Sequence, residues 1–392
     1  MTAAELRAYK GPALFSFGFR PFFLFGALWA ALAAPLWAAI YIAGGAELLG
    51  QIGRDWHVHE MLFGYLSAVV AGFLLTAVPN WTGRLPVAGA PLAALFGLWA
   101  AGRLAMLAAA WIGPAAAVVD SAFLVALAAV LWREVAAGRN WRNLPVCVLV
   151  SGLALANIGT HLRGPYPALA DVAERLALSA PAMLVALIGG RITPSFTLNW
   201  LRQHDGRIEP EPFGMVDRAA LVGAGAALLA WIAAPTNLAT GVLVSIGGLG
   251  LLIRMSRWRG AAAAREPLVL VLHAGYAWLA AALALLGGSI LAPDVIPRTA
   301  AIHALTVGAF GVMTLGVMTR ATLGHTGRAR AANRLTTAIY AAVNAAALLR
   351  VAAAFALRAQ GPLLAAVALC WAAAFLGFAV GYGPLLTRPR LA

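Results

Sequence analysis

The sequence has 392 residues, of which 62% are hydrophobic and only 11% are charged, whereas a typical soluble domain has about 25% charged residues. One soluble core of this length could not bury so much apolar surface, so the composition excludes an ordinary soluble protein and indicates one that lipid solvates. The formal charge of +14 comes from basic residues scattered through short connections, which argues against nucleic acid as a partner. Cys147 and Cys370 both lie in apolar segments, so a disulfide framework is not expected.

Twelve apolar segments are long enough to cross a bilayer as helices, which takes about 20 residues each. In chain order they are residues 21–43, 57–78, 90–109, 112–135, 143–161, 169–190, 215–234, 238–253, 267–291, 299–319, 335–354 and 362–386. Pro79 and Pro194 are expected to end helices at the cytoplasmic side of the membrane. The connections are short, and backbone inside lipid must satisfy its own hydrogen bonds. The sequence therefore predicts an all-α, polytopic membrane protein, with residues 1–392 forming a single transmembrane domain.

The basic residues predict the orientation of these segments. Most of the 28 Lys and Arg residues fall in the N-terminal tail, the C-terminal tail and alternate connections. The opposite side holds Arg54, Arg163, Arg298, Arg350 and Arg358. Because cytoplasmic loops are enriched in basic residues, both termini are predicted to be cytoplasmic. The first segment follows a tail of about twenty residues without a clear cleavage site, so it is expected to be a span and not a signal peptide.

An internal similarity links the second and tenth segments. Residues 59–84 and 303–328 share His59/His303, Gly64/Gly308, Gly72/Gly316 and a terminal Thr-Gly-Arg. The sixth segment runs in the same direction and ends in a related turn at residues 189–194. Recurrence at every fourth segment suggests a pseudo-threefold arrangement of four-helix units.

The topology places several histidines in one layer near the outer boundary. His57 and His59 open the second segment, His161 closes the fifth and His303 opens the tenth. Imidazole is a common ligand of haem iron and copper, and two facing histidines can hold a haem between helices. His59 and His303 are the natural pair, and small residues after His59 would admit a neighbouring backbone or a flat macrocycle. The alternative is that these histidines only form hydrogen bonds at the interface.

Charged residues lie at a similar depth. Arg103 and Asp120 are each about two turns from the same outer connection, so they are nearly level and can pair. One interpretation is a buried ion pair that sets helix register. The other gives Arg103 and Arg175 to haem propionates and Glu60 or Asp120 to proton handling.

Five motifs resemble those of the NnrS family of bacterial membrane proteins. They are residues 19–23 (FRPFF), 56–64 (WHVHEMLFG), 72–83 (GFLLTAVPNWTG), 190–197 (GRITPSFT) and 303–325, which begins HALTVG and ends MTRATLGH. The resemblance covers nearly the whole chain. It implies a bacterial inner-membrane protein with haem, expected to be b-type, and copper, which lessens the toxicity of nitric oxide or of iron-nitrosyl species in denitrifying cells. It also adds His325 to the candidate metal ligands, beside His57, His59, His161 and His303.

Two other functions remain open at this stage. A transporter commonly has twelve spans, but it usually places broken helices or a charge near the midplane, whereas here the polar residues gather toward one edge. An enzyme that reduces nitric oxide would need a second metal near the haem and a proton path, and the sixth and seventh segments carry no histidine. The lipid bilayer, an electron donor and nitric oxide or a nitrosylated species are the expected partners. The sequence does not decide whether the protein is an enzyme.

Overall fold

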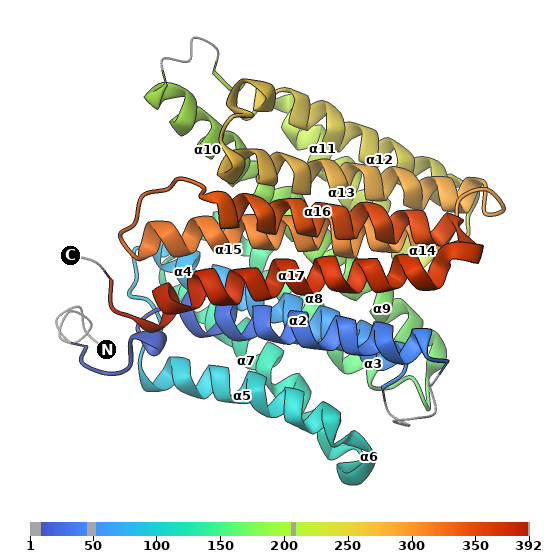
Figure 1. Ribbon diagram of the computed structural model, residues 1–392, viewed down its shortest axis with the longest axis horizontal. Coiled ribbons are helices and arrows are strands. Elements are labelled where there is room, and N and C mark those ends of the chain that lie inside the picture. The colour runs from blue at the N-terminus through green and yellow to red at the C-terminus, as the bar shows by residue number, and fades with distance from the viewer. Residues whose placement is uncertain (1–8, 45–51, 205–208, 391–392) are drawn as a thin grey trace. The chain divides into compact units, whose positions relative to one another are not determined.

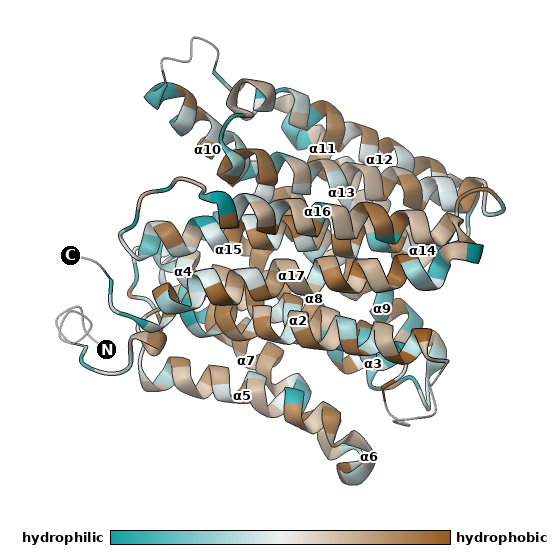
Figure 2. Ribbon diagram, in the orientation of Figure 1, coloured by the Kyte–Doolittle hydropathy of each residue, from teal (hydrophilic) through white to brown (hydrophobic). Residues whose placement is uncertain are grey.

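The computed structural model describes residues 9–44, 52–204 and 209–390. In these residues, twelve helical segments are long and apolar enough to cross a membrane, and no strand occurs among them. Figure 1 shows the helices, coloured from the N-terminus to the C-terminus, and Figure 2 shows that apolar residues predominate along them. The prediction of an all-α protein with twelve spans is confirmed, while the orientation of the termini stays a prediction.

The spans are built from one or more helical elements each. The elements in chain order are η1 (Ala13–Phe15), α2 (Phe19–Ile42), α3 (Arg54–His59), η2 (Glu60–Leu66), α4 (Ser67–Thr82), α5 (Ala90–Leu107), α6 (Ala109–Ile112), α7 (Ala115–Ala137), η3 (Trp141–Asn143), α8 (Leu144–Thr160), α9 (Pro167–Leu184), η4 (Val185–Gly189), α10 (Gly190–Gln203), α11 (Met215–Ala233), α12 (Leu238–Ser256), η5 (Gly260–Ala263), α13 (Pro267–Leu291), α14 (Arg298–His303), η6 (Ala304–Gly311), α15 (Val312–His325), α16 (Arg334–Phe355), η7 (Leu357–Ala359) and α17 (Gln360–Thr387).

The chain divides into two compact units. The first unit comprises Met1–Ala177, Met318–Arg330 and Phe375–Ala392, and the second comprises Leu178–Val317 and Ala331–Ala374. Each unit therefore combines segments that are distant in sequence. The single transmembrane domain and its pseudo-threefold arrangement stay predictions.

In the first unit, α2 packs closely against α4 and η2. A Cβ atom added to Gly72 would lie 2.8 Å from the ring of Phe23, and one added to Gly26 would lie 3.1 Å from Ala68. Small residues at such positions let two backbones approach. The small residues after His59 were predicted to admit either a neighbouring backbone or a flat macrocycle. In the structure, the neighbour that packs against them is helix α2.

The arginine of the FRPFF segment, Arg20, caps a helix in the first unit. Arg20 is buried, and its Nη1 donates hydrogen bonds to the carbonyls of Leu386, at 2.9 Å, and Arg388, at 2.6 Å. The last carbonyls of a helix lack partners within the helix. Arg20 supplies one to the C-terminal end of α17 and so connects the first span to the last.

Three spans contain a π-helical segment. These segments are η2 in the second span, η4 in the sixth and η6 in the tenth, and η2 and η6 begin directly after His59 and His303. They fall in the three spans that the internal similarity groups together. In two of these segments, a side chain from a neighbouring helix donates a hydrogen bond to a backbone carbonyl. Trp99 Nε1 donates to Gly64 in η2, and Arg254 Nη1 donates to Ala186 in η4. Because π-helical turns in α-helices frequently mark functional sites, the residues around them are candidates.

The two prolines do not end helices, so that prediction is wrong. Pro79 lies inside α4, which continues to Thr82 and stops where Gly83 adopts a left-handed conformation (φ 69°). Pro194 lies inside α10. A proline cannot donate to the carbonyl four residues earlier, and Arg254 Nη2 donates to that carbonyl, on Gly190, at 3.1 Å instead. A tertiary contact thus replaces the missing helical bond.

Arg254 should be essential to the stability of the second unit. It is fully buried, and its Nε donates to Asp217 at 3.0 Å. Replacing it with Ala removes the buried cation that faces Asp217 and a donor from the carbonyls of Ala186 and Gly190, which should cost about 3–5 kcal/mol. Thermal unfolding in detergent measures the loss. The exposed Arg259→Ala variant is the control, and equal stability of the two variants would contradict the assignment.

Candidate metal centre

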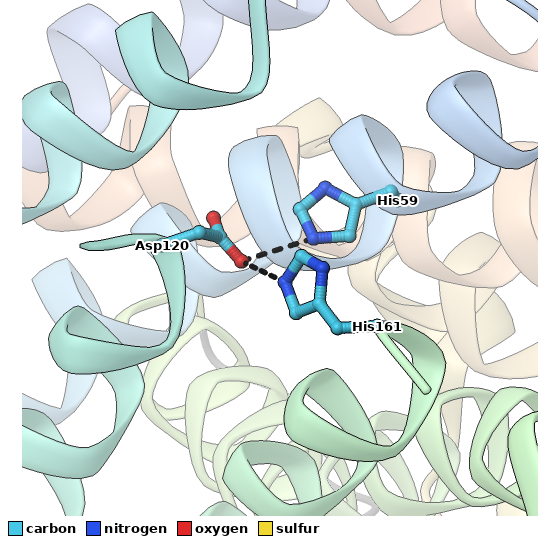
Figure 3. A group of neighbouring side chains, drawn as sticks. All are labelled: His59, Asp120 and His161. Atoms are coloured by element: carbon cyan, nitrogen blue, oxygen red, sulfur yellow. Dashed lines mark hydrogen bonds and ion pairs between the residues drawn. The ribbon is translucent and has the colours of Figure 1, made fainter. Parts of the chain in front are cut away.

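The candidate site lies in the first unit, where three helical elements bring polar side chains together. His59 is the last residue of α3, Asp120 lies in α7 and His161 caps the C-terminal end of α8. Figure 3 shows the two imidazole rings and the carboxylate facing one another. Asp120 Oδ2 lies 3.0 Å from Nε2 of His59 and 2.9 Å from Nε2 of His161. We refer to these three residues as the His59 centre.

A second layer of residues orients the His59 centre. Glu60 Oε1 lies 3.0 Å from Nδ1 of His59. When a carboxylate accepts from Nδ1–H, Nε2 is the ring nitrogen that can bind a metal ion, which is the usual arrangement around metal-bound histidine. Arg103 donates to one oxygen of Glu60 and to Oδ1 of Asp120, and Trp29 Nε1 donates to Glu60 at 2.7 Å. The predicted pairing of Arg103 with Asp120 is confirmed.

Asn157 completes this layer. It lies one turn before His161 on the same helix, it is 1% exposed, and its Oδ1 is 3.2 Å from Nε2 of His59. Asn157 was not among the candidate residues predicted from the sequence. The signal available was its spacing, because residues four apart share a helix face and His161 was already a candidate.

Gly64 provides the space that the side chains of Arg103, Glu60 and Trp29 need. A Cβ atom on Gly64 would lie 2.8 Å from Arg103 Nη1, Glu60 Oε2 and Trp29 Nε1. Any side chain at this position of η2 would therefore displace the hydrogen-bonded groups. The internal similarity contains Gly64, and the structure gives it a role beside the His59 centre.

The cluster is buried and its formal charges do not cancel. Glu60 is fully buried, Asp120 is 1% exposed and Arg103 is 4% exposed. With both imidazoles neutral, two carboxylates face one guanidinium, which leaves one negative charge in excess. Uncompensated charge is costly in a buried setting. A proton on one imidazole or a bound cation supplies the missing positive charge.

The donor set fits a transition-metal ion. The ligand atoms of His59, Asp120 and His161 lie within 4.8 Å of one another, and the described residues contain no other such group of histidine, cysteine and acidic side chains. Two imidazole nitrogens and one carboxylate oxygen suit zinc, copper or iron. Arg103 occupies Oδ1 of Asp120, so the carboxylate offers one oxygen. That arrangement disfavours calcium, which takes six to eight oxygen ligands.

The other predicted residues lie outside the His59 centre. The ring of His57 stacks on Trp37 at a centroid distance of 5.8 Å, and the ring of His325 packs against Phe19 at 5.5 Å. Arg175 is half-buried on α9. His303 belongs to the second unit, where its Nδ1 bonds to the carbonyl of Thr299 at 2.8 Å. The haem pairing of His59 with His303 and the propionate roles of Arg103 and Arg175 stay predictions.

Together the fold and the site define an α-helical, polytopic membrane protein with a buried histidine–carboxylate cluster beside a π-helical turn. Comparison with protein families then identifies it. A profile for the family described as NnrS protein matches residues 13–390, nearly the whole chain. The chain therefore belongs to the NnrS family. No curated protein matched the sequence.

Proposed function

We propose that this chain is a haem- and copper-binding inner-membrane protein of the nitric oxide stress response, and that the His59 centre is its copper site. The observation that supports the copper site most directly is the convergence of His59, Asp120 and His161, oriented by Glu60 and Arg103. Membership of the NnrS family supports the link to nitric oxide. A copper ion held there would supply binding of nitric oxide and transfer of single electrons.

For the haem we propose His303 as the residue that would bind the iron. Its Nδ1 donates to the carbonyl of Thr299, which leaves the lone pair on Nε2, the nitrogen that binds haem iron when a backbone carbonyl fixes the tautomer. Nε2 of His59 instead faces Asp120 and Asn157. We therefore assign His59 to copper and His303 to haem, while a haem shared by both histidines is the competing hypothesis.

The test is the absorption spectrum and metal content of the detergent-purified protein, reduced and then exposed to nitric oxide. The expected result is a b-type haem spectrum that nitric oxide shifts, with copper bound in addition. A colourless, metal-free preparation from cells supplied with haem and copper would overturn the proposal and favour the transporter.

His303→Ala should remove the haem and leave the copper content unchanged, because the two ligand sets share no residue in this assignment. Haem extracted per chain and copper by elemental analysis measure the two separately. His59→Ala is the matched variant, expected to lose copper and keep haem. Loss of haem from both variants would instead establish the shared-haem hypothesis.

A further inference from the structure

A second set of charged side chains lies next to the His59 centre in sequence and in the first unit, and the proposed function does not use it. It comprises Arg54, Asp55, Arg163, Asp171 and Glu174, which we call the Glu174 cluster. Arg54 and Asp55 begin α3, the helix that ends with His59. Arg163 follows His161 in the turn between α8 and α9, and Asp171 and Glu174 lie on α9. The cluster therefore joins both segments that carry the histidines of the centre.

Glu174 is the common partner in this cluster. Its Oε1 lies 2.5 Å from Nη2 of Arg54 and its Oε2 lies 3.0 Å from Nη2 of Arg163. Arg163 also pairs with Asp171 at 2.8 Å and with Asp55 at 3.4 Å. Both oxygens of Glu174 thus accept from arginines, and these bonds connect α3 to α9 and to the turn after His161.

Exposure increases from the centre toward this cluster. The Asp120 side chain is fully buried, that of His161 is 14% exposed, and that of Arg163 is 30% exposed. Glu60 and Arg103, which bond to His59 and Asp120, are both buried. Exposure therefore increases from the His59 centre through His161 to Arg163, where the Glu174 cluster connects the surrounding segments.

We propose that the Glu174 cluster is a gate that controls the passage of a metal ion between solvent and the His59 centre. This inference rests on the proposed metal site. Closing is favoured by the two arginines that share Glu174, and opening separates Glu174 from Arg54 and Arg163, which frees α3 and the turn after His161 to move apart. Ion pairs near the surface contribute little each and weaken with salt, and these pairs are partly exposed, so such a gate opens thermally and opens more often at high ionic strength.

The experiment measures how fast the metal-loaded, full-length protein loses copper to an excess of chelator. Glu174→Gln should accelerate the loss about threefold to tenfold, since it weakens two partly exposed pairs. Salt should accelerate loss from the unchanged protein and have little effect on the variant. Arg54→Gln removes the contact between Arg54 and Glu174 from the arginine side, so it should also accelerate the loss of copper. Agreement between the two variants would show that the effect does not come from a folding defect in one of them.

Glu209→Gln is the matched control. Glu209 also accepts two bonds from one arginine, Arg202, at 2.9 and 3.2 Å, but its side chain is more exposed than that of Glu174 (50% against 19%) and it lies in the second unit. It should leave the rate of loss and its salt dependence unchanged. Rates for Glu174→Gln and Arg54→Gln equal to those of the control would overturn the gate. Failure of the unchanged protein to bind copper would instead overturn the proposed function, so the two failures are distinguishable.

Discussion

His59→Ala should lower the affinity for copper on the order of a hundredfold or more. It removes one of three ligands, and even the loss of a residue that only orients a ligand costs about 10–100-fold in metal affinity. Titration against a competing chelator, with elemental analysis of the purified protein, measures the change. His57→Ala is a close control, because His57 lies two residues away on the same helix while its ring stacks on Trp37.

The remaining residues of the site extend this prediction. Asp120→Asn should match His59→Ala, because it replaces the oxygen that lies within 3.0 Å of both imidazoles. Glu60→Gln should cost about 10–100-fold, as expected for a residue that orients a ligand. His161→Ala should be milder than His59→Ala, since solvent reaches His161 and water can take its place. Copper affinity in His59→Ala equal to that of His57→Ala would exclude this cluster as the metal centre.

Arg103→Met should produce the second large effect, a loss of about 3–5 kcal/mol in the free energy of unfolding. Arg103 is 4% exposed, and its guanidinium bonds to both Glu60 and Asp120. Removing one partner from a buried ion pair leaves an uncompensated charge, which is the costly case, whereas exposed pairs contribute about 1 kcal/mol or less. Thermal unfolding in detergent measures the change.

Two further measurements identify charge as the cause. The double variant with Glu60→Gln should recover part of the lost stability, because it removes one of the two carboxylates left without a cation. Added copper should stabilise Arg103→Met more than the unchanged protein, because a bound cation then replaces the missing positive charge. Stability that neither change improves would mean that Arg103 acts through packing alone.

The sequence alone predicted the class of protein, the twelve spans and the candidate histidines His59 and His161. It could do so because lipid imposes simple requirements: each span must be apolar, about 20 residues long and helical. Polar residues in such segments stand out for the same reason. The depth of Arg103 and Asp120, counted from a shared connection, was enough to predict their pairing, which the structure confirms.

Apart from this pair on consecutive spans, only the tertiary structure decided which of the polar residues meet. The sequence does not show which spans are neighbours across a unit, so the meeting of Asp120 and Asn157 with His59 and His161 could not be predicted. The local rules for proline also failed at Pro194, where a buried arginine from another helix supplies the hydrogen bond that proline cannot make. Spans follow from local hydropathy, whereas a site depends on contacts between distant segments, which packing determines.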